Sequence, residues 1–195
     1  MQFKNKISNV SSKVISSFWG TLSHLNFDYS FKNGQTKNVT HEVYGKSDGV
    51  AVLLYNTEKQ TVILSKQFRS PIYVAGVSNG ISIELVGGAI DENENPVATA
   101  IRETEEEVGY KVERLQRVST IFLSPGIVKE KVHLFIGAYK DDDKTENGGG
   151  VFNEDEEIEV LEVSYSDALT MIEKEEIIDA RTILLLHYLK IHSIM

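Results

Sequence analysis

The chain has 195 residues, 41% of them hydrophobic and 25% charged, with a formal net charge of −9 and no cysteine. Its length allows one domain with a full hydrophobic core and a small appendage, while the acidic balance excludes an extended nucleic-acid surface, which needs clustered Lys and Arg. The longest aliphatic run, residues 183–186, is too short to cross a bilayer, and the absence of cysteine excludes disulfides and thiolate chemistry, so we expect a cytoplasmic protein without a membrane partner.

The first 45 residues differ from the rest of the chain. Residues 25–31 and 36–44 alternate apolar and polar side chains in strand fashion, and Asn33-Gly34 between them is a hairpin turn signal. We therefore predict an N-terminal β-appendage over residues 1–45 and a main domain over residues 46–195. Two strands alone are marginally stable, so the hairpin is expected to pack on the main domain or on a second copy of the chain.

The main domain alternates strands and helices. Strands are predicted at residues 50–55, 61–65, 81–86, 118–123, 132–139 and 158–163, and helices from near Pro96 and over residues 166–173 and 179–190. Residues 140–150 are polar, acidic and glycine-rich, which is typical of a mobile surface loop. This order of elements predicts an α/β domain.

The most informative segment, residues 88–110, places several carboxylates on one short helix. If the helix begins near Pro96, whose ring suits a first turn, then Glu103 and Glu107 lie one turn apart on the same face and Glu106 lies beside them. Like charges at this spacing destabilise a helix, and one neighbouring arginine can neutralise only part of them. Mg²⁺ binds carboxylate oxygens and would turn this repulsion into attraction.

The alternative is a solvated acidic face, which is what most glutamate runs on helices are. Here the run follows Gly87-Gly88 at the end of a strand-like stretch and closes with Gly109, a residue type that ends helices in a left-handed conformation. Strand, glycine loop, helix and glycine stop form one unit, which favours a metal site.

These residues resemble the Nudix box, the pattern G-x5-E-x7-R-E-U-x-E-E-x-G-U, in which U is a bulky apolar residue. The matching positions are Gly88, Glu94, Arg102, Glu103, Glu106, Glu107, Gly109 and Tyr110. Thr104 departs from the pattern, because an apolar residue that packs against the sheet is usual there. The resemblance implies a Nudix hydrolase, with the α/β/α sandwich and mixed sheet of that family, which acts on a nucleoside diphosphate linked to another moiety.

The order of further motifs along nearly the whole chain is similar to that of the bacterial GDP-mannose pyrophosphatases of the Nudix superfamily. These motifs are Gln67-Phe68-Arg69, Glu84, Ser124-Pro125-Gly126 with Glu130, the glycines 148–150, the acidic run 154–157 and residues 180–186. The resemblance implies Mg²⁺-dependent hydrolysis of GDP-mannose to GMP and mannose 1-phosphate, with Mn²⁺ as a substitute ion, in a homodimer that exchanges its N-terminal strands.

The resemblance also implies roles at the metal site. The metal ligands would be Gly87 through its carbonyl, Glu103, Glu107 and Glu156. As the catalytic base, Glu156 ranks first and Glu154 second, and Glu106 is expected to serve a second metal or to hold water. A base must come within hydrogen-bond reach of its water, so the choice between the two distal acids stays open at this point. The alternative for each single acid is a charged loop rim.

The substrate-binding residues that the resemblance implies are Trp19, Thr40, His41, Glu42, Arg69, Gly88, Ala89, Glu130, Asp155 and Arg181. Arg69 would clamp phosphate oxygens, or would pair with a glutamate of the box instead. Trp19 would stack on the nucleobase from the partner subunit, or would pack in a core. Thr40 and His41 replace a basic pair of the family, whereas Glu42 is retained and could accept from guanine N1 and N2.

Two other functions remain open. A Nudix pyrophosphatase for ADP-ribose or another nucleotide sugar would share the metal site, and a substrate panel separates it from a GDP-mannose enzyme. A non-catalytic module that senses a nucleotide sugar would usually lack acids of the box. Because these acids are all present, the sensor ranks last.

Overall fold

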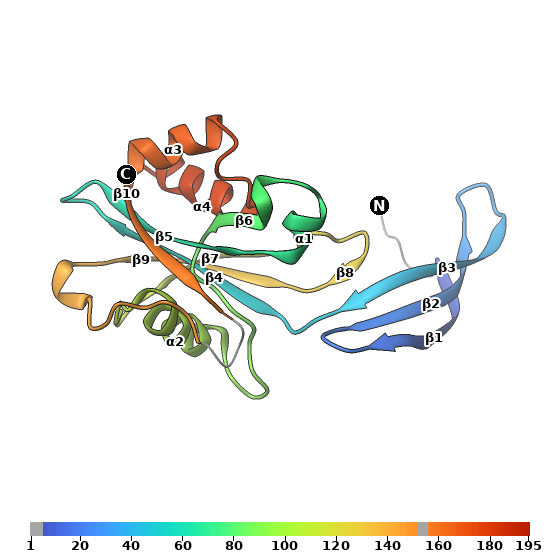
Figure 1. Ribbon diagram of the computed structural model, residues 1–195. Coiled ribbons are helices and arrows are strands. Elements are labelled where there is room, and N and C mark those ends of the chain that lie inside the picture. The colour runs from blue at the N-terminus through green and yellow to red at the C-terminus, as the bar shows by residue number, and fades with distance from the viewer. Residues whose placement is uncertain (1–5, 152–155) are drawn as a thin grey trace. The chain divides into compact units, whose positions relative to one another are not determined.

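The computed structural model describes residues 6–151 and 156–195, and the chain divides into two compact units (Figure 1). We call the first the N-terminal unit, which comprises residues 1–47 together with residues 122–131. We call the second the sandwich unit, which comprises residues 48–121 and 132–195.

The N-terminal unit is a four-stranded sheet in the order β1-β2-β3-β8. Its strands are β1 (Ile7–Ser17), β2 (Thr21–Ser30), β3 (Thr36–Gly45) and β8 (Val128–Lys129). β2 is antiparallel to both β1 and β3, and β8 is parallel to β3. The predicted hairpin is confirmed, since Ser30 pairs with Thr36 across a turn in which Gly34 has a φ of 83°. β1 and β8 are additional to the predicted strands.

The sandwich unit contains a six-stranded sheet in the order β10-β5-β4-β9-β7, with β6 paired to β5. Its strands are β4 (Gly49–Asn56), β5 (Thr61–Phe68), β6 (Ile81–Glu84), β7 (Gln116–Ile121), β9 (Val132–Ala138) and β10 (Ile158–Ser164). Its helices are α1 (Ser70–Val74), α2 (Pro96–Val108), α3 (Tyr165–Glu173) and α4 (Ala180–Ile191), with short 3₁₀ turns η1 (Ser78–Gly80) and η2 (Asp141–Asp143). β4 runs parallel to β9 and antiparallel to β5, so the sheet is mixed.

Alternation along β4 builds a core on each face of this sheet. Val50 lies in one cluster with Ala100 of α2. Ala51 lies in the other, to which α3 and α4 contribute Ala168 and Leu185. The sheet therefore lies between α2 on one side and α3 and α4 on the other (Figure 1). The predicted α/β/α sandwich with a mixed sheet is confirmed. No helix of the described part of the chain is long and apolar enough to cross a membrane.

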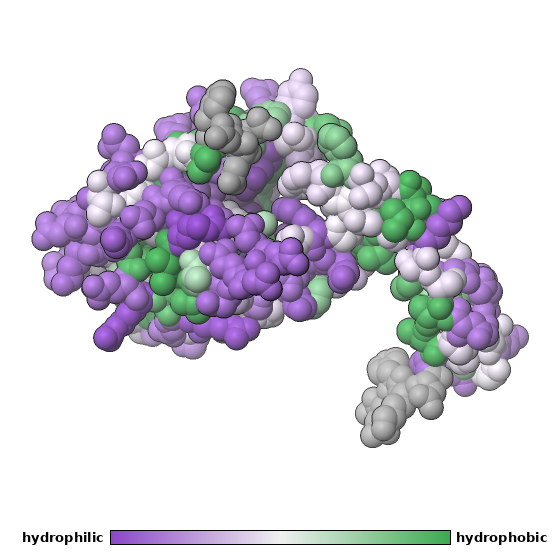
Figure 2. Space-filling model, turned by 90° about the horizontal axis from the view of Figure 1, so that it is seen from below, coloured by the Kyte–Doolittle hydropathy of each residue, from purple (hydrophilic) through white to green (hydrophobic). Residues whose placement is uncertain are grey.

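The N-terminal unit buries few apolar side chains. Among its described residues, Phe27 is the only buried hydrophobic side chain. Large apolar side chains are exposed instead along β1 and the turn that follows it, as the space-filling view illustrates (Figure 2). They are Ile7, Val10, Val14, Ile15, Phe18 and Trp19. Several large exposed apolar side chains on one strand and turn favour an interaction site.

The glycine-rich end of residues 140–150 is more than the predicted surface loop. Gly149 donates its N–H to the carbonyl of Glu107 at 2.9 Å. A Cβ at Gly148, which has a φ of 67°, would lie only 2.4 Å from the same carbonyl oxygen. Gly148 and Gly149 therefore lie against the last turn of α2, which leaves no room for a side chain at Gly148.

Candidate active site

Both ends of α2 are fixed by residues that local sequence rules single out. The side-chain oxygen of Asn95 caps the N-terminus by accepting from the N–H groups of Val97 and Ala98, each at 3.0 Å, and Pro96 begins the helix. Gly109 ends the helix with a φ of 75°. The predicted start and stop of this helix are confirmed.

Glu103 and Glu107 lie one turn apart on the buried face of α2. They are 8% and 1% exposed, whereas Glu106 is exposed next to them. Burial is the main cause that raises the pKa of Glu103 to about 7 and the pKa of Glu107 to about 8, and the charge of Glu156 acts in the same direction on both. Two buried carboxylates with this little compensating charge are a setting that favours a bound cation.

The glycine loop before α2 brings backbone groups against these carboxylates. The N–H of Gly87 donates to Glu107 Oε2 at 3.0 Å. The carbonyls of Val86 and Gly88 instead accept from N–H groups of β4. In an extended segment the N–H and C=O of one residue point to the same side, so the Gly87 carbonyl also faces α2. We therefore expect the loop to turn one backbone oxygen toward this helix.

A side chain at either glycine of this loop would force a neighbouring group to shift. A Cβ at Gly88 would lie 2.1 Å from Glu103 Oε1, and a Cβ at Gly87 would lie 2.2 Å from the carbonyl oxygen of Val50. Ala89, the next residue, forms an antiparallel bridge with Gly49 at the start of β4. Close packing of the loop between β4 and α2 explains the glycine pair.

Arg102 is enclosed by carboxylates of the acidic segment. Its guanidinium nitrogens lie 2.8 Å from Glu106, 3.0 Å from Glu103 and 3.2 Å from Glu94. No Lys or Arg of the described residues lies at ion-pair distance from Glu107, so the most deeply buried carboxylate of the helix keeps the least compensation.

The departure from the box at Thr104 is accommodated within the helix. Thr104 is fully buried, and its Oγ1 donates to the carbonyl of Ala100 at 2.7 Å. Because a back-bond within the helix satisfies the hydroxyl, the side chain packs without a polar partner on the sheet.

Arg69 and Arg181 meet at one buried carboxylate, that of Glu84. Arg69 follows β5, Glu84 ends β6 and Arg181 lies in the first turn of α4. Arg69 donates to Glu84 through Nε and Nη2, and Arg181 donates through Nη2. The predicted alternative partner of Arg69, a glutamate of the box, is wrong. No role for Glu84 could be assigned from the sequence alone, although a lone carboxylate in the apolar stretch 81–86 indicates a buried charge that needs partners.

Glu156 is the distal acid that the structure describes. Its charge acts on both Glu103 and Glu107, which puts it in their vicinity. Glu154 and Asp155 lie outside the described residues. Over residues 6–151 and 156–195, no three Asp, Glu or His side chains already converge to hold a metal ion. The oxygen ligands that the structure brings close together are the carboxylates of Glu103 and Glu107 on α2.

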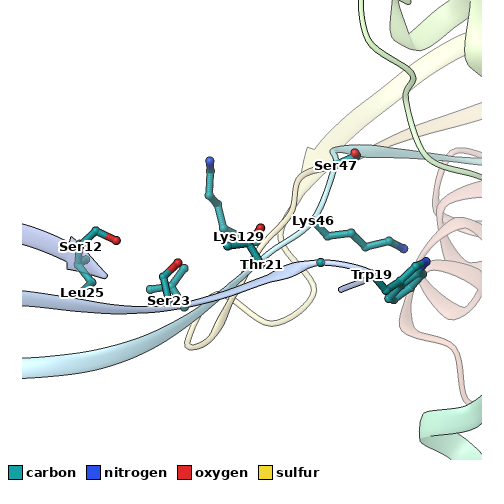
Figure 3. A pocket seen from close by; sticks show the side chains of 11 residues that line it. Ser12, Trp19, Thr21, Ser23, Leu25, Lys46, Ser47 and Lys129 are labelled. Carbon is teal, nitrogen blue, oxygen red and sulfur yellow. The ribbon is translucent and has the colours of Figure 1, made fainter. Parts of the chain in front are cut away.

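Trp19 lies in a pocket of the N-terminal unit, between the end of β1 and the start of β2. The side chain of Lys46 extends toward the indole (Figure 3), and its Nζ lies 4.4 Å from the ring centroid. Glu130 Oε1 lies 3.7 Å from the same Nζ. Trp19 is 74% exposed, which does not fit the alternative of a packed core aromatic. Lys46 could not be predicted from the sequence as a neighbour of Trp19, since only the fold brings it to the indole.

The predicted base-recognition residues Thr40, His41 and Glu42 lie on β3 and alternate between its two faces. Thr40 and Glu42 share one face, where Thr40 Oγ1 accepts from Asn26 at 2.9 Å. His41 points to the opposite face, where its ring packs edge-on against Phe27 at 5.3 Å. The strand therefore separates His41 from the other two.

Comparison with known sequence families matches the two parts of the chain to two domains. Residues 45–186 match the NUDIX domain. Residues 6–44 match the GDP-mannose pyrophosphatase NudK N-terminal domain. The first match contains the whole acidic segment, and the second covers the strands β1, β2 and most of β3.

Similar proteins cover almost the full length of the chain. A GDP-mannose pyrophosphatase of Citrobacter koseri is 42% identical over 190 residues, which is 97% of this chain and 98% of that protein. One of Escherichia coli (strain K12) is 40% identical over the same shares. One of Salmonella typhimurium is 40% identical over 189 residues, with 97% of each chain covered.

Proposed function

Because the chain belongs to the Nudix hydrolases, we propose that it cleaves the pyrophosphate of GDP-mannose to give GMP and mannose 1-phosphate. The observation that carries this proposal is the full-length similarity to GDP-mannose pyrophosphatases, which includes their N-terminal domain as well as the NUDIX domain. The acidic segment supports it, since its box carboxylates are all present and two of them are buried side by side.

The donor set at α2 fits a hard divalent cation. It consists of oxygens alone, and the two buried carboxylates lack a full complement of positive charge, which is the chemistry that Mg²⁺ requires. The residues that would hold Mg²⁺, or Mn²⁺ in its place, are Gly87, Glu103, Glu107 and Glu156. The ion would neutralise phosphate charge and polarise the phosphorus centre.

The chain's own residues would perform the remaining steps. Glu156, or Glu154 in its place, would take a proton from the attacking water while the new O–P bond forms and the bridging P–O bond breaks. Arg69 and Arg181 would hold phosphate oxygens, and Glu106 would orient water. The remaining contacts with substrate would come from Gly88, Ala89, Glu130, Asp155, Trp19, Thr40, His41 and Glu42.

Product analysis tests the proposed function. Purified protein is incubated with Mg²⁺ and, in parallel, with GDP-mannose, ADP-ribose and other nucleotide sugars. We expect GMP and mannose 1-phosphate as the preferred products. Preference for ADP-ribose would reject the assignment of the base and sugar while keeping the metal site, and cleavage of none of the compounds would favour the sensor.

Trp19 gives a direct readout of base binding, because it is the only tryptophan of the chain. We expect Trp19→Ala to raise the KM for GDP-mannose roughly 5- to 150-fold, the equivalent of one stacked base. Titration of the wild type with GMP should change the tryptophan fluorescence. Phe18→Ala is the matched control, because Phe18 is a fully exposed neighbour to which no contact with substrate is assigned. Equal KM values for the two variants would contradict base stacking on Trp19.

A homodimer in which the N-terminal strands are exchanged is part of the proposal, as is a cytoplasmic setting. The exposed apolar side chains of the N-terminal unit support the dimer, since a second copy could cover them. The chain has no cysteine and so no disulfide that would require an oxidising compartment, which is compatible with the cytoplasm. Sedimentation equilibrium tests the assembly, and a monomer at micromolar concentration would contradict it.

A further inference from the structure

A single carboxylate joins two arginines that are far apart in the sequence. Glu84 Oε1 accepts from Arg69 Nε at 3.1 Å, and Oε2 accepts from Arg69 Nη2 at 2.9 Å. Oε2 also accepts from Arg181 Nη2 at 2.8 Å. The Glu84 side chain is only 4% exposed, so water cannot replace these donors. The three residues form one ionic group at the junction of β5, β6 and α4.

A second carboxylate fixes Arg181 from the other side. Asp179 is the N-cap of α4, where one oxygen accepts from the N–H of Thr182 at 2.9 Å. Its other oxygen accepts from Arg181 Nε at 2.9 Å. Arg181 is therefore held between Asp179 and Glu84, whereas the side-chain hydrogen bonds of Arg69 all go to Glu84.

The two arginines keep Glu84 ionised despite its burial. Burial raises the pKa of Glu84, but the hydrogen bond and charge of Arg69 and the charge of Arg181 outweigh it, so that the net pKa is lowered. Glu84 thus stays ionised and gives both guanidinium groups a fixed geometry, because charge-assisted bonds to a planar fork are directional.

One guanidinium nitrogen of each arginine, Nη1, is not used in the contacts with Glu84 and Asp179. Within the described residues, neither Arg69 Nη1 nor Arg181 Nη1 has a hydrogen-bond partner. Both side chains remain partly exposed, at 38% and 19%. Burial raises the pKa of Glu107 and the charge of Arg69 acts to lower it, so the Arg69 guanidinium lies within electrostatic range of that carboxylate of α2. Two partly exposed guanidinium groups held at one carboxylate, one of them within electrostatic range of Glu107, suit the oxygens of a diphosphate.

We propose that Glu84 is a positioning residue that holds Arg69 and Arg181 as a two-guanidinium clamp for the diphosphate of the substrate. The inference rests on the proposed function for the identity of the substrate, but only the diphosphate is needed for the clamp. Glu84 does not contact substrate and acts through the two arginines, whose orientation is fixed before the substrate arrives.

Two possible roles of Glu84 predict opposite changes in the affinity for an anion when Glu84 is replaced by Gln. If Glu84 acted only through its charge, Glu84→Gln would make the site more positive and would tighten binding of an anion. If it positions the arginines, Glu84→Gln weakens binding, because a neutral amide cannot hold both guanidinium groups. The direction of the change therefore separates the two roles.

The test measures binding of inorganic pyrophosphate in Mg²⁺ buffer by calorimetry. We expect about tenfold weaker binding to Glu84→Gln than to the wild type, together with a KM for GDP-mannose raised more than kcat is lowered. Glu159→Gln is the matched control, because it removes a carboxylate from an exposed ion pair with Lys66 on neighbouring strands and should change neither value.

Thermal melting shows whether Glu84→Gln folds. If it does not, Glu84→Asp keeps the charge, is one methylene too short to reach both arginines, and should bind pyrophosphate less tightly than the wild type. Equal or tighter binding by a folded variant overturns the proposal, as does a wild type that binds no pyrophosphate. If the wild type binds pyrophosphate and Glu84→Gln does so more weakly, but GDP-mannose is not cleaved, the proposed function fails and the clamp stands.

Discussion

Replacing Glu107 by Gln is expected to lower kcat/KM for GDP-mannose by about 10³-fold, the equivalent of several kcal/mol of transition-state stabilisation from a metal ion. Glu107 is the most deeply buried carboxylate of α2 and has the least compensation from neighbouring cations. The amide keeps the acceptor for the Gly87 N–H, which now lies 3.0 Å from Glu107 Oε2, but it removes the charge that would hold a cation. We therefore expect Glu107→Gln to lose activity without losing stability.

The measurement combines steady-state kinetics with thermal melting with and without Mg²⁺. Mg²⁺ should raise the melting temperature of the wild type, whereas that of Glu107→Gln should stay unchanged by the ion. Without metal the variant should be at least as stable as the wild type, because a buried and poorly compensated charge is gone. Glu105→Gln, on the same helix, is the control and should keep its activity. Wild-type turnover by Glu107→Gln would remove this residue from the metal site.

Gly148→Ala is expected to destabilise the fold by about 3 kcal/mol, through backbone strain and the loss of close packing against α2. Its φ of 67° suits few residues other than glycine, and an added Cβ would lie 2.4 Å from the Glu107 carbonyl oxygen and 2.6 Å from Val108 Cα. Either the loop or the last turn of α2 would have to shift. Activity should fall as well, since the same turn carries Glu107.

Urea unfolding measures this change as a lower midpoint at an unchanged slope. Gly126→Ala is the control, because Gly126 does not have a positive φ and an added Cβ would meet nothing within 4 Å. We expect it to be near neutral. Equal midpoints for the two variants would show that the contact between the glycine segment and α2 contributes little.

The sequence predicted α2 and the sandwich well because their signals are local. Proline and glycine mark the ends of the helix, and strands such as β4 are continuous apolar runs. β1 was missed for the opposite reason. It is rich in serine and exposed throughout, and two register shifts interrupt the alternation that would reveal a strand. α1 buries no residue, so its sequence carries no apolar period.

In the candidate site as well, local sequence signals predicted some features and missed others. The carboxylates of α2 could be predicted because helix periodicity alone puts Glu103 and Glu107 on one face. The partners of Glu84 could not, since its bond to Arg181 joins residues 97 positions apart, and only the folded chain brings them together. The same holds for Lys46 beside Trp19. Local rules predicted the candidate ligands, whereas the contacts that orient the groups around them depend on tertiary packing.

Because β8 pairs with β3, a chimaera with a related protein must exchange two separate segments of the chain to exchange the N-terminal sheet. The chain passes between the two units at residues 47/48, 121/122 and 131/132, so the N-terminal unit is not one continuous stretch. A graft that exchanged only the first 44 residues, the end of the N-terminal family match, would join β8 to a foreign β3. To transfer the N-terminal unit intact, a chimaera must therefore include both residues 6–47 and residues 122–131.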